Sequence, residues 1–392
     1  MPMECPSEPA ADSASSPAVR TSGPLVWRLG YGMAGIEEIR EAWDRLAHSG
    51  TMTPTADAAW MASFWSAFGN IDRDLVIHAL YCGDQLVAVV PMRRRGRWVR
   101  TWRSVRNPEN PCWAFCMDES RPELAEAILD HLLESVEYID LLAFHRDTIY
   151  YEALTSAARR RKLPMWEAEL AGDALSDLPG SAVEAPPLSK NLTKNCQKAQ
   201  RQLEKLGTLT FDLMSGGPGM MELLEECFRL EASGWKGTHG NPILRDPAMR
   251  AFYERLAEAE AAHGRLALYT LRLDGRLLAF EYCIRGQGRI YALKSAYDPE
   301  FAQFSPSNLL RFFIFRKESA DGVCQTYHYG RPSEWKMRWA NRVRPLVRLR
   351  IYSGRPRSRL AYWSGPRLRG FAKRVLARFR PARELGLSAP GR

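Results

Sequence analysis

Apolar residues along the chain follow two spacings, one typical of helices and the other typical of strands. Read in order, they predict helices followed by strands joined through short turns, and then the same order again. The predicted elements are helices at 35–49 and 58–69 before strands at 74–82 and 85–92, and helices at 217–233 and 246–264 before strands at 265–273, 276–284 and 289–297. The pattern therefore predicts an α/β (α+β) chain with two similar domains, each a mixed, mainly antiparallel sheet flanked by helices.

A stretch rich in small residues and proline, AGDALSDLPGSAVEAPP, separates the two halves and predicts a linker. The N-terminal residues, rich in Ala, Ser and Pro, predict a disordered leader. The similar order of elements in the two halves suggests a tandem repeat of one fold. The predicted organisation is a leader at 1–24, a first domain at 25–170, the linker at 171–187, a second domain at 188–352 and a basic tail at 353–392.

Charge adds a separate feature at one end of the chain. Lys and Arg number 55 against 45 Asp and Glu, for a net charge of +10. From residue 336 onward there are 17 Lys and Arg and one acid, so this end carries +16 and the rest of the chain −6. Residues 365–380 set apolar side chains at helical spacing among cations, which favours contact of residues 364–380 with an anionic membrane surface. Docking on the acidic body of the protein and RNA binding are the alternatives.

The sequence also lacks the marks of several classes of protein. No apolar run approaches the roughly 18 residues of a membrane-spanning helix, and the leader has no apolar segment typical of a secretory signal. Eight cysteines without a CxxC pair indicate reduced thiols, so we expect a cytoplasmic protein, at the inner face of the membrane if the tail binds lipid. The motifs Gx4GK[ST], HExxH and GxSxG are absent, which argues against metal-dependent and Ser or Cys nucleophile chemistry. We therefore expect no metal.

Four segments in the second half carry a family resemblance. They are LEASGWKG at 230–237, GRLALYTLRLDGRLLAFEYCI at 264–284, YALKSAYDPEFAQFSPSNLL at 291–310 and YHYGRPSEWKMRW at 327–339. In this order they resemble the GNAT acyltransferases of the CelD-like, FemAB-related branch, with a BioF-type acetyltransferase domain over 188–352. The first domain, including VAVVPM, is similar to the degenerate N-terminal GNAT-like half of that family. One departure is Ser307, which stands where the family tends to have Gly.

The resemblance implies transfer of an acyl group, usually acetyl from acetyl-CoA or another acyl-CoA, to an amine or hydroxyl of a small molecule or cell-surface polysaccharide precursor. A CoA thioester is already activated, so direct transfer needs positioning, carbonyl polarisation, a base and a proton donor for the thiolate, without a covalent enzyme intermediate. A helix that begins near residue 305 offers free N–H groups and a positive dipole end to a pyrophosphate, although a plain Ser-capped helix fits the sequence equally well. The predicted cofactor-binding residues are Ser305, Pro306, Ser307, Asn308, Leu309 and Leu310.

Glu281 is the most informative single residue, because it is a carboxylate among small residues in a core-like strand. A register that pairs residue 281 with residue 292 would place Lys294 diagonally beside it on the same face. Glu281 is then a base or amine anchor, or a member of a structural ion pair. At the end of the next strand, Tyr297 is a candidate proton donor to the thiolate, and Asp298 is either catalytic or part of a turn. The predicted catalytic residues are Glu281, Lys294, Tyr297 and Asp298.

Four residues outside the hairpin are predicted to bind substrate. Trp235 and Lys236 end a helix and begin a loop long enough to line a cleft, although Trp235 is equally suited to a core. Lys336 and Trp339 belong to the last family motif, and in isolation they form an ordinary basic helix face.

Two alternatives to an acyl-CoA enzyme remain. A FemAB-type aminoacyl transferase would take its donor from charged tRNA, and the arginine-rich segment 93–106 and the basic tail would supply phosphate contacts. A catalytically inactive GNAT-like scaffold at the membrane surface is the other alternative, favoured by Ser307 in place of Gly.

Overall fold

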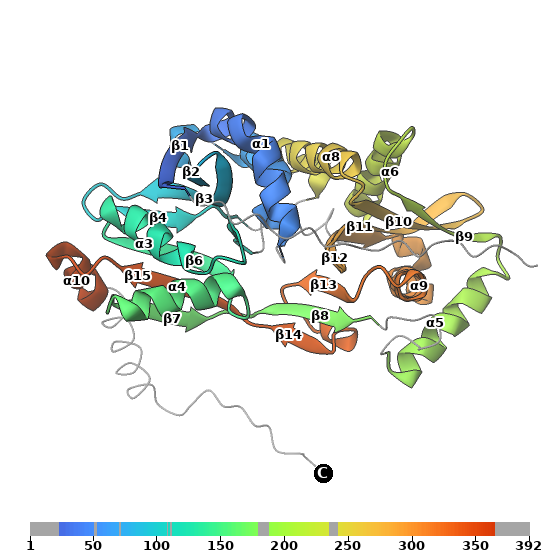
Figure 1. Ribbon diagram of the computed structural model, residues 1–392. Coiled ribbons are helices and arrows are strands. Elements are labelled where there is room, and N and C mark those ends of the chain that lie inside the picture. Colours follow the sequence, from blue (N-terminus) through green and yellow to red (C-terminus); the bar gives the residue numbers. More distant parts are fainter. Residues whose placement is uncertain are drawn as a thin grey trace, which may run out of the picture.

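A computed structural model describes residues 23–50, 53–69, 72–107, 109, 112–178, 188–234 and 242–364. Two sheets lie side by side, each flanked by helices (Figure 1). The first sheet contains β1 (Leu25–Tyr31), β2 (Leu75–Cys82), β3 (Gln85–Arg95), β4 (Thr101–Ser104), β5 (Cys116–Met117), β6 (Tyr138–His145), β7 (Met165–Glu169) and β15 (Leu346–Tyr352). The second contains β8 (Asp173–Asp177), β9 (Leu209–Met214), β10 (Leu266–Leu273), β11 (Arg276–Gly286), β12 (Arg289–Tyr297), β13 (Thr326–Gly330) and β14 (Arg342–Arg344).

Helices flank both sheets. They are α1 (Gly32–Ser49), α2 (Ala58–Phe68), α3 (Leu124–Glu134) and α4 (Ile149–Arg160) in the first half, and α5 (Lys190–Leu203), α6 (Met220–Ser233), α8 (Pro247–Ala262), α9 (Pro306–Asp321) and α10 (Pro356–Tyr362) in the second. Of these, α1, α2, α6 and α8 lie where the sequence pattern predicts helices. Short 3-10 turns include η4 (Pro299–Phe304) and η5 (Lys336–Arg338). Asp57 and Ser189 cap α2 and α5 through their side chains.

The two sheets repeat one topology, which confirms the predicted tandem, mainly antiparallel fold. The first runs β1-β2-β3-β4-β6-β15-β7 and the second runs β9-β10-β11-β12-β13-β8-β14. The pairs on the path are antiparallel except β4 with β6 and β12 with β13, which occupy the same position in each sheet. In each sheet, the strand after the parallel pair comes from the other half of the chain. β15 pairs with β6 in the first sheet, and β8 pairs with β13 in the second.

This exchange of strands differs from the predicted boundaries. Residues 173–177 fall in the predicted linker, yet they form β8 between β13 and β14. Residues 346–352 fall in the predicted second domain, yet they form β15 between β6 and β7 of the first sheet. The residues of β8 and β15 do not indicate which strands they pair with, because the pairing is made through the backbone with segments distant in sequence. Residues 179–187 of the predicted linker lie outside the described residues.

The predicted tail also begins later than expected. Within residues 353–392, α10 packs on the first domain, where the hydroxyl of Ser358 donates to the carbonyl of Glu137 (2.6 Å). The predicted amphipathic segment from residue 365 onward and residues 1–22 of the leader lie outside the described residues. Among the helices that are described, none is long and apolar enough to cross a membrane. Seven cysteines fall in the described ranges; all seven are buried, and none of them forms a disulfide.

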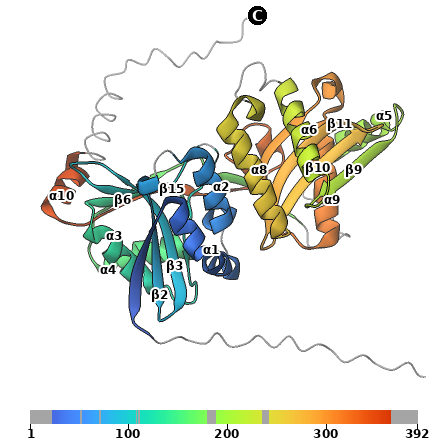
Figure 2. The same ribbon diagram turned by 90° about the horizontal axis from the view of Figure 1, so that it is seen from above.

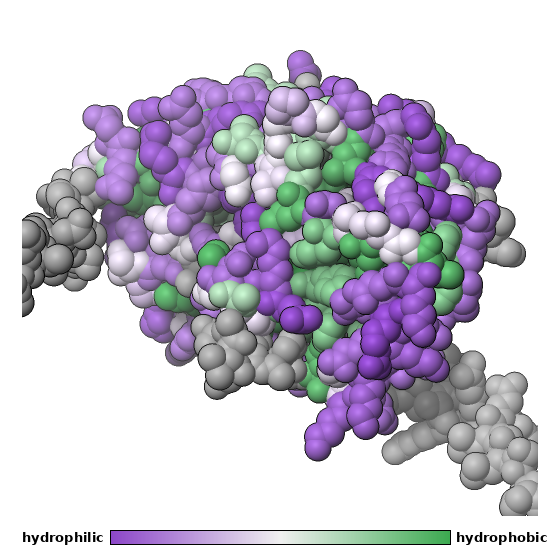
Figure 3. Space-filling view, turned by 90° about the vertical axis from the view of Figure 1, so that its right-hand side faces the viewer, coloured by the Kyte–Doolittle hydropathy of each residue, from purple (hydrophilic) through white to green (hydrophobic). Residues whose placement is uncertain are grey.

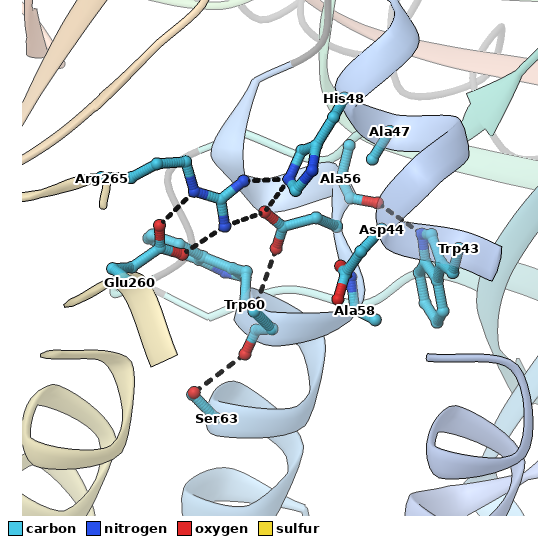
Figure 4. Close-up of polar contacts among 12 residues, drawn as sticks. Trp43, Asp44, Ala47, His48, Ala56, Ala58, Trp60, Ser63, Glu260 and Arg265 are labelled. Atoms are coloured by element: carbon cyan, nitrogen blue, oxygen red, sulfur yellow. Dashed lines mark hydrogen bonds and ion pairs between the residues drawn. The ribbon is translucent and has the colours of Figure 1, made fainter. Parts of the chain in front are cut away.

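Helices α2 and α8 join the two domains (Figure 2). Phe252 of α8 packs against Trp60 and Phe68 of α2, with ring centroids 5.5 Å apart in both pairs. Beside this apolar contact, Arg265, just before β10, binds Glu260 (2.7 Å) in α8 (Figure 4). Arg265 also binds Asp57 (2.7 Å) in the first domain. The contact fixes how the two sheets face each other and so shapes the space between them.

Candidate functional site

The second sheet opens between β12 and β13. These parallel strands pair only at three positions, the last being Tyr291 with His328, and then they diverge. A cavity of about 510 Å³ lies beside the open edge, lined by residues 292–297 of β12 and by the first turn of α9. A strand edge without a partner presents unpaired backbone N–H and C=O groups. The opening therefore offers hydrogen-bond donors to a ligand carbonyl inside a partly enclosed space.

Glu281 lines this cavity, but its partner is not the predicted one. The carboxylate of Glu281 binds the guanidinium of Arg311 on α9 (2.7 Å), and both side chains are 2% exposed. Residue 281 pairs with Ser295 and not with residue 292. The predicted register was wrong because Gln287 and Gly288, both with positive φ, form a two-residue turn, and a β-bulge at Leu293 shifts the remaining pairs.

Arg311 is enclosed by aromatic rings. Its guanidinium carbon lies 4.8 Å from the ring centre of Trp335, 5.3 Å from that of Trp339 and 5.8 Å from that of Tyr329. Burial alone would lower the pKa of Arg311, but the nearby charge of Glu281 outweighs it and holds the pKa above its usual value. Within the described residues, Oε2 of Glu281 and Nε of Arg311 are buried and have no hydrogen-bond partner. This pair consequently has capacity left to bind a ligand group.

Two of the other predicted catalytic residues, Lys294 and Tyr297, line the same cavity as Glu281. Lys294 lies opposite Tyr282, on the other face of β11 from Glu281, and its ammonium group binds Glu109 of the first domain (3.2 Å). The predicted Lys294–Glu281 ion pair is therefore wrong. Tyr297 is 38% exposed and borders the cavity, so it keeps the access that a proton donor needs.

Asp298 has a structural place. Its carboxylate accepts from the N–H of Glu300 (3.0 Å), and it forms an ion pair with Arg276 (2.6 Å). These are the contacts of a residue that caps a turn, which was the structural alternative for Asp298. Its oxygen atoms face these partners and not the cavity, whose lining residues do not include Asp298.

Only some of the residues predicted to bind the cofactor line the cavity. Ser305, Ser307 and Asn308 line the cavity, whereas the side chains of Leu309 and Leu310 are buried in the core of the second domain. Ser305 adopts a left-handed backbone (φ 50°) and makes no side-chain cap, so the Ser-cap alternative was wrong. Its carbonyl accepts from the N–H groups of Asn308 and Leu309, and buried Pro306 has no N–H. The free N–H groups at this helix start are therefore fewer than predicted.

A second hollow continues from the start of α9 toward α5. It measures about 640 Å³, shares Ser305, Asn308 and Trp335 with the cavity at β12, and has Lys198 and Arg338 in its lining. Seen from this end of the molecule, the surface shows an apolar area framed by hydrophilic side chains (Figure 3). The two hollows together suit a long ligand that is apolar at one end and anionic at the other.

The predicted substrate-binding residues fall in three places. The ammonium group of Lys336 donates to the carbonyl of Tyr329, and its side chain borders the cavity. Trp339 is 3% exposed and donates through Nε1 to the amide oxygen of Asn308 (3.2 Å). It therefore belongs to the core and holds the side chain of Asn308 in place. Trp235 and Lys236 lie outside the described residues, although Gly234, just before them, borders the cavity.

Sequence reasoning missed a histidine on the opposite side of the opening. Nδ1 of His328 lies 3.0 Å from Oδ2 of Asp173, and the imidazole stacks on Tyr291 with ring centres 4.5 Å apart. These residues line a cavity of about 830 Å³ between the two domains, which shares Ala292 and Leu293 with the cavity at β12. An imidazole that donates its Nδ1–H to a carboxylate keeps Nε2 as an acceptor, and here Nε2 lies 3.2 Å from the hydroxyl of Thr326. The only sequence signal was a histidine inside the last family motif.

An acidic cluster lies near the domain contact. Single ligand atoms of Asp44, His48 and Asp57 lie within 4.8 Å of one another, close enough to share an ion. The carboxylate of Asp44 lies near Ala58 (Figure 4) and accepts from its N–H (3.0 Å). Asp57 accepts from the N–H of Trp60 (2.8 Å) and binds Arg265. These protein donors explain the cluster as part of the contact between domains.

Comparison with known proteins agrees with this geometry. Residues 190–337 match the family model of the acetyltransferase (GNAT) domain. The solved structure of FemX is 11% identical and covers 79% of this chain and 95% of its own, with a TM-score of 0.52. The C-terminal domain (DUF2156) of a putative lysylphosphatidylglycerol synthetase from Agrobacterium fabrum is 12% identical, with coverages of 83% and 95% and a TM-score of 0.50. No curated protein matches in sequence. Residues 190–337 therefore match a GNAT acetyltransferase domain, and the fold of the chain is similar to that of FemX.

Proposed function

We propose that the protein is an acyl-CoA-dependent N-acyltransferase, with acetyl-CoA as the simplest donor. The observation that carries this proposal is the opening between β12 and β13, with a cavity that leads to the start of α9. The acyl thioester would lie in the opening, where the unpaired edge of β12 polarises its carbonyl. The CoA phosphates would lie at Ser305 and Ser307 and in the hollow that Lys198 and Arg338 border.

The reaction would be a direct transfer between two cavities that meet at β12. The acceptor nitrogen attacks the carbonyl carbon, a C–N bond forms, the C–S bond breaks, and CoA leaves as a thiolate. The proton lost by the nitrogen goes to a base, and the thiolate takes a proton from a donor. We assign the base to His328, which Asp173 orients and which would take the proton at Nε2, beside the hydroxyl of Thr326. We assign the proton donor to Tyr297. Glu281, held by Arg311, would anchor the acceptor nitrogen or an amide of the donor through its unpartnered oxygen.

Isothermal titration tests the donor site. Acetyl-CoA and longer acyl-CoAs are titrated into the folded protein, and at least one is expected to bind with one site per chain. The proposal is refuted if no acyl-CoA binds to protein that has a normal circular dichroism spectrum.

Aminoacyl transfer from charged tRNA is the second candidate. Arginines on β3 and β4 border the cavity between the domains, as contacts to RNA phosphates would require, and the fold is similar to that of FemX. A salt-sensitive complex with charged tRNA in a gel shift, together with no binding of acyl-CoA, would favour this candidate.

A further inference from the structure

Large apolar side chains are exposed at the end of the first domain that faces away from the second sheet. Trp98, in the turn between β3 and β4, is 82% exposed, and Val99 beside it is also exposed. On α10, which lies at this end (Figure 1), Leu360 is 68% exposed, and Trp363 directly after α10 is 56% exposed. Exposed apolar side chains that gather on one surface mark a site of contact with another molecule.

The buried residue Glu137 joins the turn to α10. The carboxylate of Glu137 accepts from the N–H of Arg100 (2.5 Å), and the N–H of Glu137 donates to the carbonyl of Arg100 (2.9 Å). The carbonyl of Glu137 accepts from the hydroxyl of Ser358 on α10 (2.6 Å). Two segments that are far apart in the sequence are therefore held close together at this end of the first domain.

Arginines without acidic partners accompany the exposed apolar side chains. Arg97 lies beside the ring of Trp98, 5.8 Å from the ring centre, and Arg357 and Arg359 are exposed on α10. Within the ranges that the structure describes, none of these three arginines forms an ion pair with an acid. We give the name end surface to Arg97, Trp98, Val99, Arg357 and Leu360.

We propose that the end surface binds the interface of a lipid bilayer that contains anionic lipids. Arginine is attracted to the negative headgroups, and tryptophan is enriched where the headgroups meet the acyl chains. The exposed Val99 and Leu360 favour a partner with an apolar layer over RNA, because RNA would need only cations for its phosphates and aromatic rings for its bases. The inference does not depend on the proposed acyl transfer.

The sequence that follows α10 has the same sign of charge. The described part of the chain ends at Ser364, two residues after the end of α10. Residues 365–380 contain six Lys and Arg and no Asp or Glu. Because these cations follow directly on the end surface in the chain, they would add to its attraction to anionic lipids.

The test measures how the full chain and its variants bind lipid vesicles in co-sedimentation. One set of vesicles contains phosphatidylcholine alone, and the other contains phosphatidylcholine and phosphatidylglycerol in equal parts. The variants are Trp98→Ala, Leu360→Ala and Arg97→Gln, each checked for folding by circular dichroism. The matched controls are Val323→Ala and Arg316→Gln, which change an exposed apolar residue and an exposed arginine of the second half.

We expect the native chain to bind the vesicles with phosphatidylglycerol and not those of phosphatidylcholine alone, and to bind less tightly as the salt concentration rises. Arg97→Gln should weaken this binding by about fivefold, which corresponds to about 1 kcal/mol for one cation near the surface, and Arg97→Lys should bind as the native chain does. Trp98→Ala and Leu360→Ala should each weaken it by about fivefold or more, because less apolar surface enters the interface. Both controls should leave binding unchanged.

The inference is overturned if the native chain does not bind the anionic vesicles, if it binds both kinds of vesicle equally, or if the three variants bind as the controls do. A loss confined to Arg97→Gln also overturns it, since charge alone would then explain the attraction. A gel shift with tRNA and sedimentation velocity without lipid examine other partners. If Trp98→Ala and Leu360→Ala remove an RNA complex or a dimer and leave vesicle binding unchanged, the end surface binds that partner and the inference is wrong.

Discussion

The buried pair of Glu281 and Arg311 gives the sharpest test of the site. Replacing Arg311 with Gln leaves a carboxylate without its partner in a place where both side chains are 2% exposed. At 2.7 Å and an effective dielectric constant of about 20, the lost attraction is about 6 kcal/mol before solvation is counted. Breaking a buried pair by removing one partner typically costs about 3–5 kcal/mol, and we expect Arg311→Gln to fall in that range.

The reverse change should cost less. With Glu281→Gln, the guanidinium of Arg311 keeps its contacts with the rings of Trp335 and Trp339, and no carboxylate is left without a partner beside it. We therefore expect about 1–3 kcal/mol for this change. In the double variant neither charge remains, so the two effects should fall short of additivity by at least about 1 kcal/mol.

Urea denaturation followed by tryptophan fluorescence measures these free energies of unfolding. Arg316→Gln is the matched control, because Arg316 is an exposed arginine on the same helix, and it should change stability by less than about 0.5 kcal/mol. The reasoning is refuted if Arg311→Gln behaves like this control, or if the double variant shows full additivity.

Three further predictions concern donor binding, catalysis and pH. Ser295→Phe should weaken acyl-CoA binding by at least about tenfold in isothermal titration, because residue 295 lies opposite Glu281 and the larger side chain would fill part of the cavity. The control Thr210→Phe, at an exposed position of β9, should leave this binding unchanged. His328→Gln should lower kcat by about 10²- to 10⁴-fold with unchanged acyl-CoA affinity, and an unchanged kcat would remove His328 from the reaction. Burial, helped by the charge of Asp57, raises the pKa of Glu260 from 4.5 to about 8, so the native state holds a proton that the unfolded chain releases. Stability should therefore fall as pH rises from about 5 to about 8, and the same urea titrations on Glu260→Gln should show a flatter profile.

Elements formed by neighbouring residues were predictable from the sequence. The spacing of apolar residues predicted α2, β2 and the start of β3 within one residue, because each depends on its own side chains and turn, whereas β3 continues three residues beyond its predicted end. The resemblance of four ordered segments placed the opening of the second sheet in the correct region. Glu281 was recognisable because an ionised group in an apolar strand needs a partner.

Features that depend on distant segments were not predictable. Arg311 lies in the run LLRFFIF, where its position on the helix gives no sign that it faces β11. His328 and Asp173 are 155 residues apart and meet only because β8 pairs with β13. The register at Glu281 was missed since one bulged residue changes which face each later side chain occupies.

The exchange of β8 and β15 has a consequence for how this protein can be divided. A fragment that ends at residue 178 would leave the first sheet with a gap between β6 and β7, and a fragment that starts at residue 188 would leave the second with a gap between β13 and β14. Each gap exposes two rows of backbone groups that invite association with other chains. The two halves therefore form one folding unit, and a chain nicked between residues 178 and 188 should stay together as a complex. Excising the second half for separate study would remove a strand that it needs.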